Sequence, residues 1–192
     1  SAVAAGSIAS ASYDGRPLTG QVVTDNYFKV LGVGMLLGRP LLPEDAPSPG
    51  ARAVVVLSHE AWRTQFASDP AIVSREITLN GRRFAVVGVT KPGQLLPGDD
   101  IVGFWAPLTM ASAFQAADPW QEAAKPSLSV VGRLRPGATE AQLRAWFDTW
   151  LRQRFPSGTE RAPRRVGCGR ERARLMVATG INGESKGTVE MP

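Results

Sequence analysis

The sequence predicts an α+β fold in which short strands alternate with short helices, and three observations indicate it. A continuous apolar run at 53–57 is typical of a strand buried on both faces. Asn80-Gly81 lies between alternating hydrophobic residues and predicts a tight hairpin. A capping box at 139–142 (Thr-x-x-Gln) precedes an amphipathic helix. Because the chain contains no fixed-period repeat, a solenoid is excluded.

Length and composition indicate one domain or two small subdomains. The 192 residues, 43% hydrophobic and 20% charged, suit a folded protein with its own core. A formal charge of +5 is compatible with an anionic partner, yet such an excess is common on soluble domains. No apolar window reaches the roughly 18 residues of a membrane-spanning helix, and no secretory signal peptide is visible.

The first 50 residues predict one strand and one long loop around a short helix. Residues 1–15 are small and polar without a persistent period, so we expect an irregular entry to the chain. The first strand is expected at 21–23. Residues 38–50 follow as a loop, because their four prolines exclude a helix interior.

The short helix can be capped by Thr24 or Asp25, and Gly32 suits its left-handed end. Its buried side chains are expected to be Tyr27, Phe28 and Leu31. Gly32, Gly34 and Gly38 have neither the spacing of a dinucleotide-binding loop nor that of a P-loop. We therefore expect these glycines to form turns, not a phosphate site.

The middle of the chain predicts a strand followed by a helix. Ser58 comes directly after the strand at 53–57 and can cap a helix over 59–66. Asp69-Pro70 closes that helix and starts another short turn.

The hairpin at Asn80-Gly81 has a predicted register as well as a predicted turn. A two-residue turn pairs Leu79 with Arg82 and Ile77 with Phe84. The buried face is expected to carry Ile77, Leu79, Phe84 and Val86. The opposite face carries Thr78 and Arg83.

The last third predicts two strands and two helices. A short strand at 101–108 ends at a proline, and a modest helix is expected over 109–117. A half-exposed strand at 127–135 leads to the capped helix, which Pro156 ends. The expected core stripe of that helix is Leu143, Trp146, Phe147, Trp150 and Leu151. The arginine-rich tail contains one strand-like run at 174–179.

Nucleophile and base pairs are few in this sequence. His59 is the single histidine, which excludes sites that need two imidazoles. It is adjacent to Ser58, but neighbours at a helix N-terminus do not face each other, so we interpret Ser58 as a cap. Cys168 has arginines nearby that favour a thiolate, yet it lacks a histidine or resolving-cysteine partner.

Carboxylate pairs occur in two loops, at Glu44-Asp45 and Asp99-Asp100. Either pair could contribute to a cation site, but neither has the calcium-loop framework, so solvated loop polarity is the expected role. The sequence therefore predicts no catalytic, cofactor-binding or metal-binding residues.

The order of the segments resembles a known family. The matching segments are NYFKVLGV at 26–33, GRPLLPED at 38–45, VVVLS at 54–58, W-x-x-x-F-x-x-D-P at 62–70 and VVGV at 86–89. Together they resemble the MacB-like extracytoplasmic core domain of ABC transporter permeases, in the MacB, FtsX and LolCE group. The resemblance covers roughly residues 20–155, and the tail after Pro156 lies outside it.

The resemblance implies a single extracytoplasmic core domain over residues 1–192, with a porter-like α/β part (20–57 and 126–192) and an inserted, mostly β part (58–125). It implies a periplasmic or extracellular location beside the bacterial cytoplasmic membrane, within an integral membrane protein. The domain would not be an enzyme. It would couple ATP-driven movement of transmembrane helices to the handling of substrates or partners outside the membrane.

The implied partners are the permease's own transmembrane helices and a cytoplasmic ABC ATPase, with a periplasmic adaptor or a second permease copy as further partners. No cofactor and no nucleic acid are implied. Two alternatives stay open at this stage. One is a basic nucleic-acid-binding module, suggested by the charge, and the other is a small hydrolase that uses Ser58 or Cys168.

Overall fold

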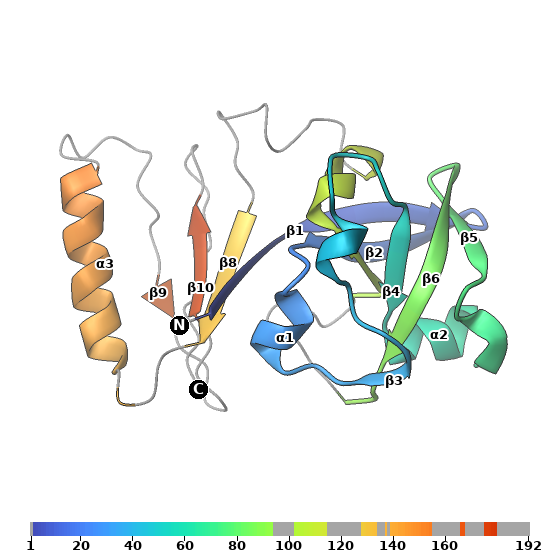
Figure 1. Cartoon of the computed structure of the whole chain (residues 1–192), viewed down its shortest axis with the longest axis horizontal. Helices are drawn as coiled ribbons and strands as arrows, with labels where there is room; N and C mark the ends of the chain where they lie inside the picture. Colours follow the sequence, from blue (N-terminus) through green and yellow to red (C-terminus); the bar gives the residue numbers. More distant parts are fainter. Residues whose placement is uncertain are drawn as a thin grey trace. The chain divides into compact units, whose positions relative to one another are not determined.

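The structure is a computed structural model that describes residues 2–93, 102–114, 128–133, 137, 139–154, 166–167 and 175–179. The chain divides into a larger unit, Gly6–Asp118, and a smaller unit formed by Ser1–Ala5 and Pro119–Pro192. Strands and short helices are mixed in the chain (Figure 1), so the predicted α+β fold is confirmed. The predicted assignment of residues 20–57 and 126–192 to a porter-like part and of 58–125 to an insertion stays a prediction.

The larger unit is built on a mixed sheet whose strand order is β3-β6-β4-β7-β2-β1, with β5 paired to β6. Its strands are β1 (Ala2–Tyr13), β2 (Arg16–Val23), β3 (Met35–Gly38), β4 (Val54–Leu57), β5 (Glu76–Leu79), β6 (Arg82–Thr90) and β7 (Phe104–Pro107). The β2/β7 and β4/β6 pairs are parallel, while β1/β2, β3/β6, β4/β7 and β5/β6 are antiparallel. β5 lies on the outer side of β6 (Figure 1).

The core of the larger unit lies around β4, whose four residues are all buried. A continuous run of branched side chains forms this strand because both of its faces are covered. The largest fully buried side chains include three aromatic residues, Phe28, Phe84 and Phe104. Trp105 extends the aromatic packing, with its ring centroid 5.6 Å from that of Phe28.

Two helices of the larger unit follow the sequence predictions. In α1 (Tyr27–Leu31), Gly32 takes the left-handed C-terminal conformation at φ 71°, whereas the N-cap position is Asn26 and not Thr24 or Asp25. In α2 (His59–Gln65), Ser58 is the N-cap, and its hydroxyl accepts a hydrogen bond from the Ala61 N–H at 3.1 Å. The proline-rich loop contains one short 3₁₀ helix, Pro43–Asp45.

The hairpin register is also confirmed. Leu79 pairs with Arg82 and Ile77 with Phe84, and both residues of the Asn80-Gly81 turn have positive φ. The predicted apolar face is buried, with Ile77, Leu79, Phe84 and Val86 each no more than 6% exposed.

Besides the N-cap of α1, two predictions in the larger unit are wrong and one strand was missed. Residues 1–15 are no irregular entry, because β1 and β2 form a long hairpin around Asp14-Gly15. The buried side of that hairpin is small, for example Ala9 and Ala11, so its alternation with Ser10 and Ser12 gives a weak hydrophobic signal. The helix expected over 109–117 is a 3₁₀ helix, Leu108–Ala113, in the part that the structure describes, and residues 115–117 lie outside the described residues. The short strand β3 was not predicted at all.

The smaller unit contains three strands and a helix among the residues that the structure describes. β10 (Leu175–Thr179), in the predicted strand-like run, pairs antiparallel with β8 (Leu128–Arg133) and with β9 (Val166–Gly167). The capping box of α3 (Glu140–Arg154) is confirmed, since Thr139 and Gln142 exchange hydrogen bonds of 2.9 and 3.3 Å.

The predicted core stripe of α3 is only partly correct. Phe147 is buried, but Trp146 is 62% exposed, so this tryptophan is a surface residue. The side chains of Trp150 and Leu151 lie outside the described part. Successive residues of an α-helix are rotated about the helix axis by roughly a quarter of a turn, so two adjacent aromatic residues need not lie on the same face. Among the described residues, no helix combines the length and apolar character that crossing a membrane requires.

Candidate functional site

The residues considered for chemistry do not come together in one place. Ser58 is buried, and its hydroxyl is occupied as the cap of α2. The His59 N–H donates to the Thr90 hydroxyl at 3.2 Å, and its ring lies against Trp62 at 5.6 Å. Asp99, Asp100 and Cys168 lie outside the described residues. In the described part of the chain, no three metal-binding side chains are grouped.

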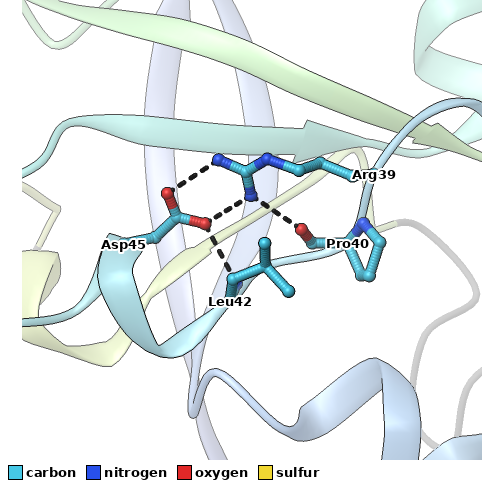
Figure 2. A network of polar contacts seen from close by, with 4 residues as sticks. All are labelled: Arg39, Pro40, Leu42 and Asp45. Carbon is cyan, nitrogen blue, oxygen red and sulfur yellow. Dashed lines mark hydrogen bonds and ion pairs between the residues drawn. The ribbon is translucent and has the colours of Figure 1, made fainter.

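In the first of the two carboxylate pairs, Asp45 has a structural role, whereas Glu44 is exposed. Both terminal nitrogens of Arg39 donate hydrogen bonds to the Asp45 carboxylate, at 2.6 and 2.9 Å (Figure 2). Arg39 also donates to the Pro40 carbonyl at 3.0 Å. The Leu42 N–H donates to the same carboxylate at 3.0 Å. The Asp45 side chain is 1% exposed and that of Arg39 is 39% exposed, so the segment GRPLLPED is closed on itself by a bidentate ion pair whose carboxylate is buried.

Asp45 stays ionised in this setting. Burial by itself raises the pKa of Asp45, but the hydrogen bonds from Arg39 and Leu42 and the positive charges of Arg39 and Arg52 outweigh that effect. The pKa of Asp45 therefore lies below its ordinary value. The pKa of Arg39 is raised above its ordinary value, chiefly by its hydrogen bond to Asp45. Solvated loop polarity, the predicted role, is wrong for Asp45 because its carboxylate is buried and fully bonded.

Close backbone approach explains two glycines next to this loop. A Cβ on Gly38 would lie 2.2 Å from the Val87 carbonyl oxygen, and one on Gly88 would lie 2.2 Å from the Arg39 carbonyl oxygen. Only residues without side chains fit there. Turn and packing geometry thus accounts for these positions.

A groove of about 700 Å³ lies on the surface of the larger unit. Three segments line it: the tip of the β1–β2 hairpin at 12–15, the chain after α2 between Phe66 and Ile72, and β5 with its flanking residues. We call it the hairpin groove. It is the candidate functional site, since specific sites are concave and of this size.

Asn80 joins the two hairpins at one end of the hairpin groove. Its N–H donates to the Ser12 carbonyl at 3.2 Å, and its side-chain oxygen accepts from the Ser12 N–H at 2.8 Å. Its side-chain amide donates to the carbonyls of Ser10 and Ala113 at 3.1 and 3.2 Å. The turn residue of one hairpin therefore also holds β1 of the other hairpin.

The motif W-x-x-x-F-x-x-D-P forms the floor of the hairpin groove. The Trp62 indole N–H donates to the Asp69 carbonyl at 2.8 Å, and the Asp69 carboxylate accepts from the Ala71 N–H at 2.8 Å and pairs with Arg75. The Phe66 ring packs on Tyr13, with centroids 4.6 Å apart. Phe66 and Asp69 of the motif thus line the groove, and Trp62 holds the Asp69 carbonyl in place.

Left-handed backbone conformations gather at the same place. Among the described residues, five that are not glycine have positive φ. All five line the hairpin groove or lie between its lining residues: Asp14, Ala67, Ser68, Ser74 and Asn80. Such conformations are costly outside glycine, asparagine and aspartate, and they concentrate where a fixed local shape is required.

Sequence reasoning did not find this groove. The W-x-x-x-F-x-x-D-P motif was interpreted as a feature of the family, and the Asn-Gly turn as the sign of a hairpin. Neither was connected with a groove. They are brought together by the β1–β2 hairpin, whose first strand was predicted to be irregular.

The family model for the MacB-like periplasmic core domain matches residues 1–149. This is more than half of the chain. The chain belongs to the MacB-like periplasmic core domain family. It is thus a periplasmic domain of a MacB-like ABC transporter permease, on the periplasmic or extracellular side of the bacterial cytoplasmic membrane. The predicted resemblance is confirmed.

Solved structures show the same fold. The periplasmic region of MacB from Actinobacillus actinomycetemcomitans matches with a TM-score of 0.55 and 17% identity, over 80% of this chain and 66% of that one. A domain of a protein described as a permease, from Porphyromonas gingivalis, matches with a TM-score of 0.54 and 11% identity, over 100% of this chain and 75% of that one. The chain thus spans about two thirds of the length of the MacB periplasmic region. A comparison with curated proteins finds no match.

Proposed function

We propose that this MacB-like periplasmic core domain transmits movement between the membrane part of its permease and partners outside the membrane. ATP hydrolysis by a cytoplasmic ABC ATPase would move the transmembrane helices, and the domain would follow as a rigid body. Repacking of interfaces between rigid parts is an established way to carry such a change. The observation that carries the proposal is the family match over residues 1–149.

The packing of the larger unit supports a rigid transmitting role. Its central strand is buried on all four residues, and the GRPLLPED segment is closed by the bidentate Arg39–Asp45 pair, whose carboxylate is buried. Packed cores respond to force by switching between discrete arrangements and do not deform continuously. The larger unit is therefore suited to move as one piece.

We also infer that the domain is not an enzyme and that its direct partners are the permease's transmembrane helices. Ser58, the nucleophile considered for a hydrolase, is engaged as a helix cap. A periplasmic adaptor or a second permease copy completes the proposed set of partners. The proposed architecture keeps a porter-like part and an inserted, mostly β part.

The first test is the parent gene. Apolar spans of about 20 residues on both sides of this segment, with lysine and arginine on their cytoplasmic flanks, are expected for a permease. An open reading frame with no such span would overturn the proposal.

The second test measures coupling in the whole permease, reconstituted in vesicles with its ATPase. Arg39→Ala removes the partner of the buried Asp45 carboxylate, whereas Arg63→Ala removes an ion pair of the same 2.6 Å length in which both side chains are exposed. We expect Arg39→Ala to lower the amount of substrate moved per ATP hydrolysed and Arg63→Ala to leave it unchanged. Equal coupling in both variants, with the domain of Arg39→Ala shown to be loosened by proteolysis, would contradict the transmission role.

A further inference from the structure

The hairpin groove exposes the outer edge of β5. This strand pairs with β6 only, in the register that matches Leu79 with Arg82. The residues that flank a two-residue turn form a hydrogen-bonded pair, and such pairs alternate along an antiparallel ladder. Ile77 therefore bonds to β6, while the N–H and C=O groups of Thr78 and Glu76 point away from it.

Two recorded bonds agree with this direction. Ala85, which lies opposite Glu76, turns away from β5, because its N–H donates to the Ala53 carbonyl at 2.9 Å. Asn80 is the next residue in the outward set, and its N–H donates to the Ser12 carbonyl across the groove. The outward edge of β5 thus faces the tip of the β1–β2 hairpin.

Beyond Asn80 this edge is open. In the part of the chain that the structure describes, no turn or loop hydrogen bond joins the main-chain groups of Thr78 or Glu76 to another residue. The side chain of Thr78 is exposed, and both residues line the hairpin groove. An open edge of this kind is a template for a further strand.

The charged residues that line the hairpin groove favour a positively charged ligand. Three carboxylates, from Asp14, Asp69 and Glu76, face one guanidinium, from Arg75. Asp69 pairs with Arg75, and Glu76 pairs with Arg83 at 3.2 Å. Among the described residues, Asp14 takes part in no ion pair, and it is exposed at the rim. Two of the three carboxylates are thus compensated by arginines, and the charge left over in the groove is the single negative charge of Asp14.

We infer that the hairpin groove binds an extended, lysine- or arginine-bearing peptide segment of a partner protein. The segment adds as a strand to the outer edge of β5, where the main-chain groups of Glu76 and Thr78 bond to it. Its basic side chains lie toward Asp14. The inference rests on the proposed function only for the partner's location outside the membrane.

The test uses the 192-residue chain and a synthetic peptide of ten residues, capped at both ends, with lysine at every second position and threonine or valine between. A second peptide carries glutamate in place of lysine. Binding is measured by calorimetry, and the amide resonances of the chain are followed by NMR. We expect the lysine peptide to bind and to shift the amide resonances of Glu76 and Thr78.

Thr78→Pro separates main-chain pairing from contact by side chains. Proline removes the outward N–H and is tolerated at an edge position whose N–H faces away from the ladder. We expect the lysine peptide to bind about two- to tenfold more weakly to Thr78→Pro. Thr78→Val keeps the N–H and is expected to bind within about twofold of the unmodified chain. The NMR spectrum of each variant shows whether it is folded.

Asp14→Asn tests the charge and keeps a residue that tolerates the left-handed turn. We expect about two- to fivefold weaker binding of the lysine peptide, in line with one exposed charge contact. Glu44→Gln, an exposed carboxylate on the GRPLLPED segment, is the matched control and should change nothing.

Several outcomes would overturn the inference. They are no binding of the lysine peptide, equal binding of the glutamate peptide, or resonance shifts that omit β5. If Thr78→Pro fails to fold, a lysine peptide with N-methylated main-chain amides replaces it as the test. This peptide cannot donate main-chain hydrogen bonds, so it must bind the unmodified chain more weakly than the lysine peptide does. Failure here leaves the coupling test on the whole permease untouched, and failure of coupling leaves the peptide result standing.

Discussion

The two hairpins of the larger unit have the same turn and different side-chain roles. Asp14-Gly15 has φ values of 48° and 73°, and Asn80-Gly81 has 50° and 77°. Asn80 uses its side chain to bind β1 and the 3₁₀ helix after β7, whereas Asp14 lies exposed at the groove rim. A turn sequence therefore fixes the backbone, but the neighbouring strand decides whether its side chain also holds the fold together.

The largest expected effect concerns the aromatic contact that anchors the first hairpin. Phe66→Ala should lower the free energy of unfolding by about 3–5 kcal/mol, because it leaves a cavity under Tyr13. Trp146→Ala, which removes an exposed aromatic side chain, should change it by about 0.5 kcal/mol or less. Urea unfolding of both variants measures this. A small loss in Phe66→Ala would show that the first hairpin does not depend on this contact.

The side-chain role of Asn80 gives the next effect. Asn80→Gly keeps the positive φ but loses three side-chain hydrogen bonds, so we expect a loss of about 2 kcal/mol. Asp14→Gly adds the same freedom to the unfolded chain and should cost about 0.5 kcal/mol or less. Equal losses in thermal unfolding of the two variants would remove the distinction between the hairpins.

The turn glycines should behave alike. An added Cβ meets nothing within 4 Å at either Gly15 or Gly81, so only the positive φ opposes it. Gly15→Ala and Gly81→Ala should each cost about 1 kcal/mol. A difference clearly above experimental error between the two unfolding midpoints would mean that the turns are not equivalent in backbone geometry.

The smallest expected effect is that of pH on the difference in unfolding free energy between Asn80→Gly and the unmodified chain. The depressed pKa of Asp45 contributes stability above the unfolded-state value of about 4, and this stability is lost as pH falls through the lower folded-state pKa. Asp45 lies in neither hairpin. Both Asn80→Gly and the unmodified chain should therefore lose that contribution equally in urea titrations between about pH 7 and 3. If the difference in unfolding free energy between the two proteins changed with pH, a carboxylate with a shifted pKa would have to lie at the contacts of Asn80.

Sequence reasoning succeeded where a local rule decides the structure. The Asn80-Gly81 turn, the Ser58 cap and the capping box of α3 each depend on residues within a few positions of one another. It failed at β1, because alternating alanine and serine bury little apolar area and give no strong period. It also failed at Trp146, because the number of buried faces of a helix is set by its neighbours and not by its own sequence.

The hairpin groove could not have been predicted for a related reason. Its walls come from residues 12–15 and 75–81, and its floor from 66–72, so it exists only once strand pairing is known. Recognising the missing hairpin from Asp14-Gly15 would have been the one available signal. The turns at Asp14-Gly15 and Asn80-Gly81 together would have predicted the two hairpins between which the groove lies.

The buried carboxylate of the Arg39–Asp45 pair affects how this segment responds to the salt concentration around the domain. Small ions outside the cytoplasmic membrane follow the external medium, so their concentration varies. Mobile ions screen exposed pairs such as Glu60–Arg63, but they screen a carboxylate that is 1% exposed far less. The GRPLLPED segment should therefore hold its shape nearly unchanged from dilute to concentrated salt.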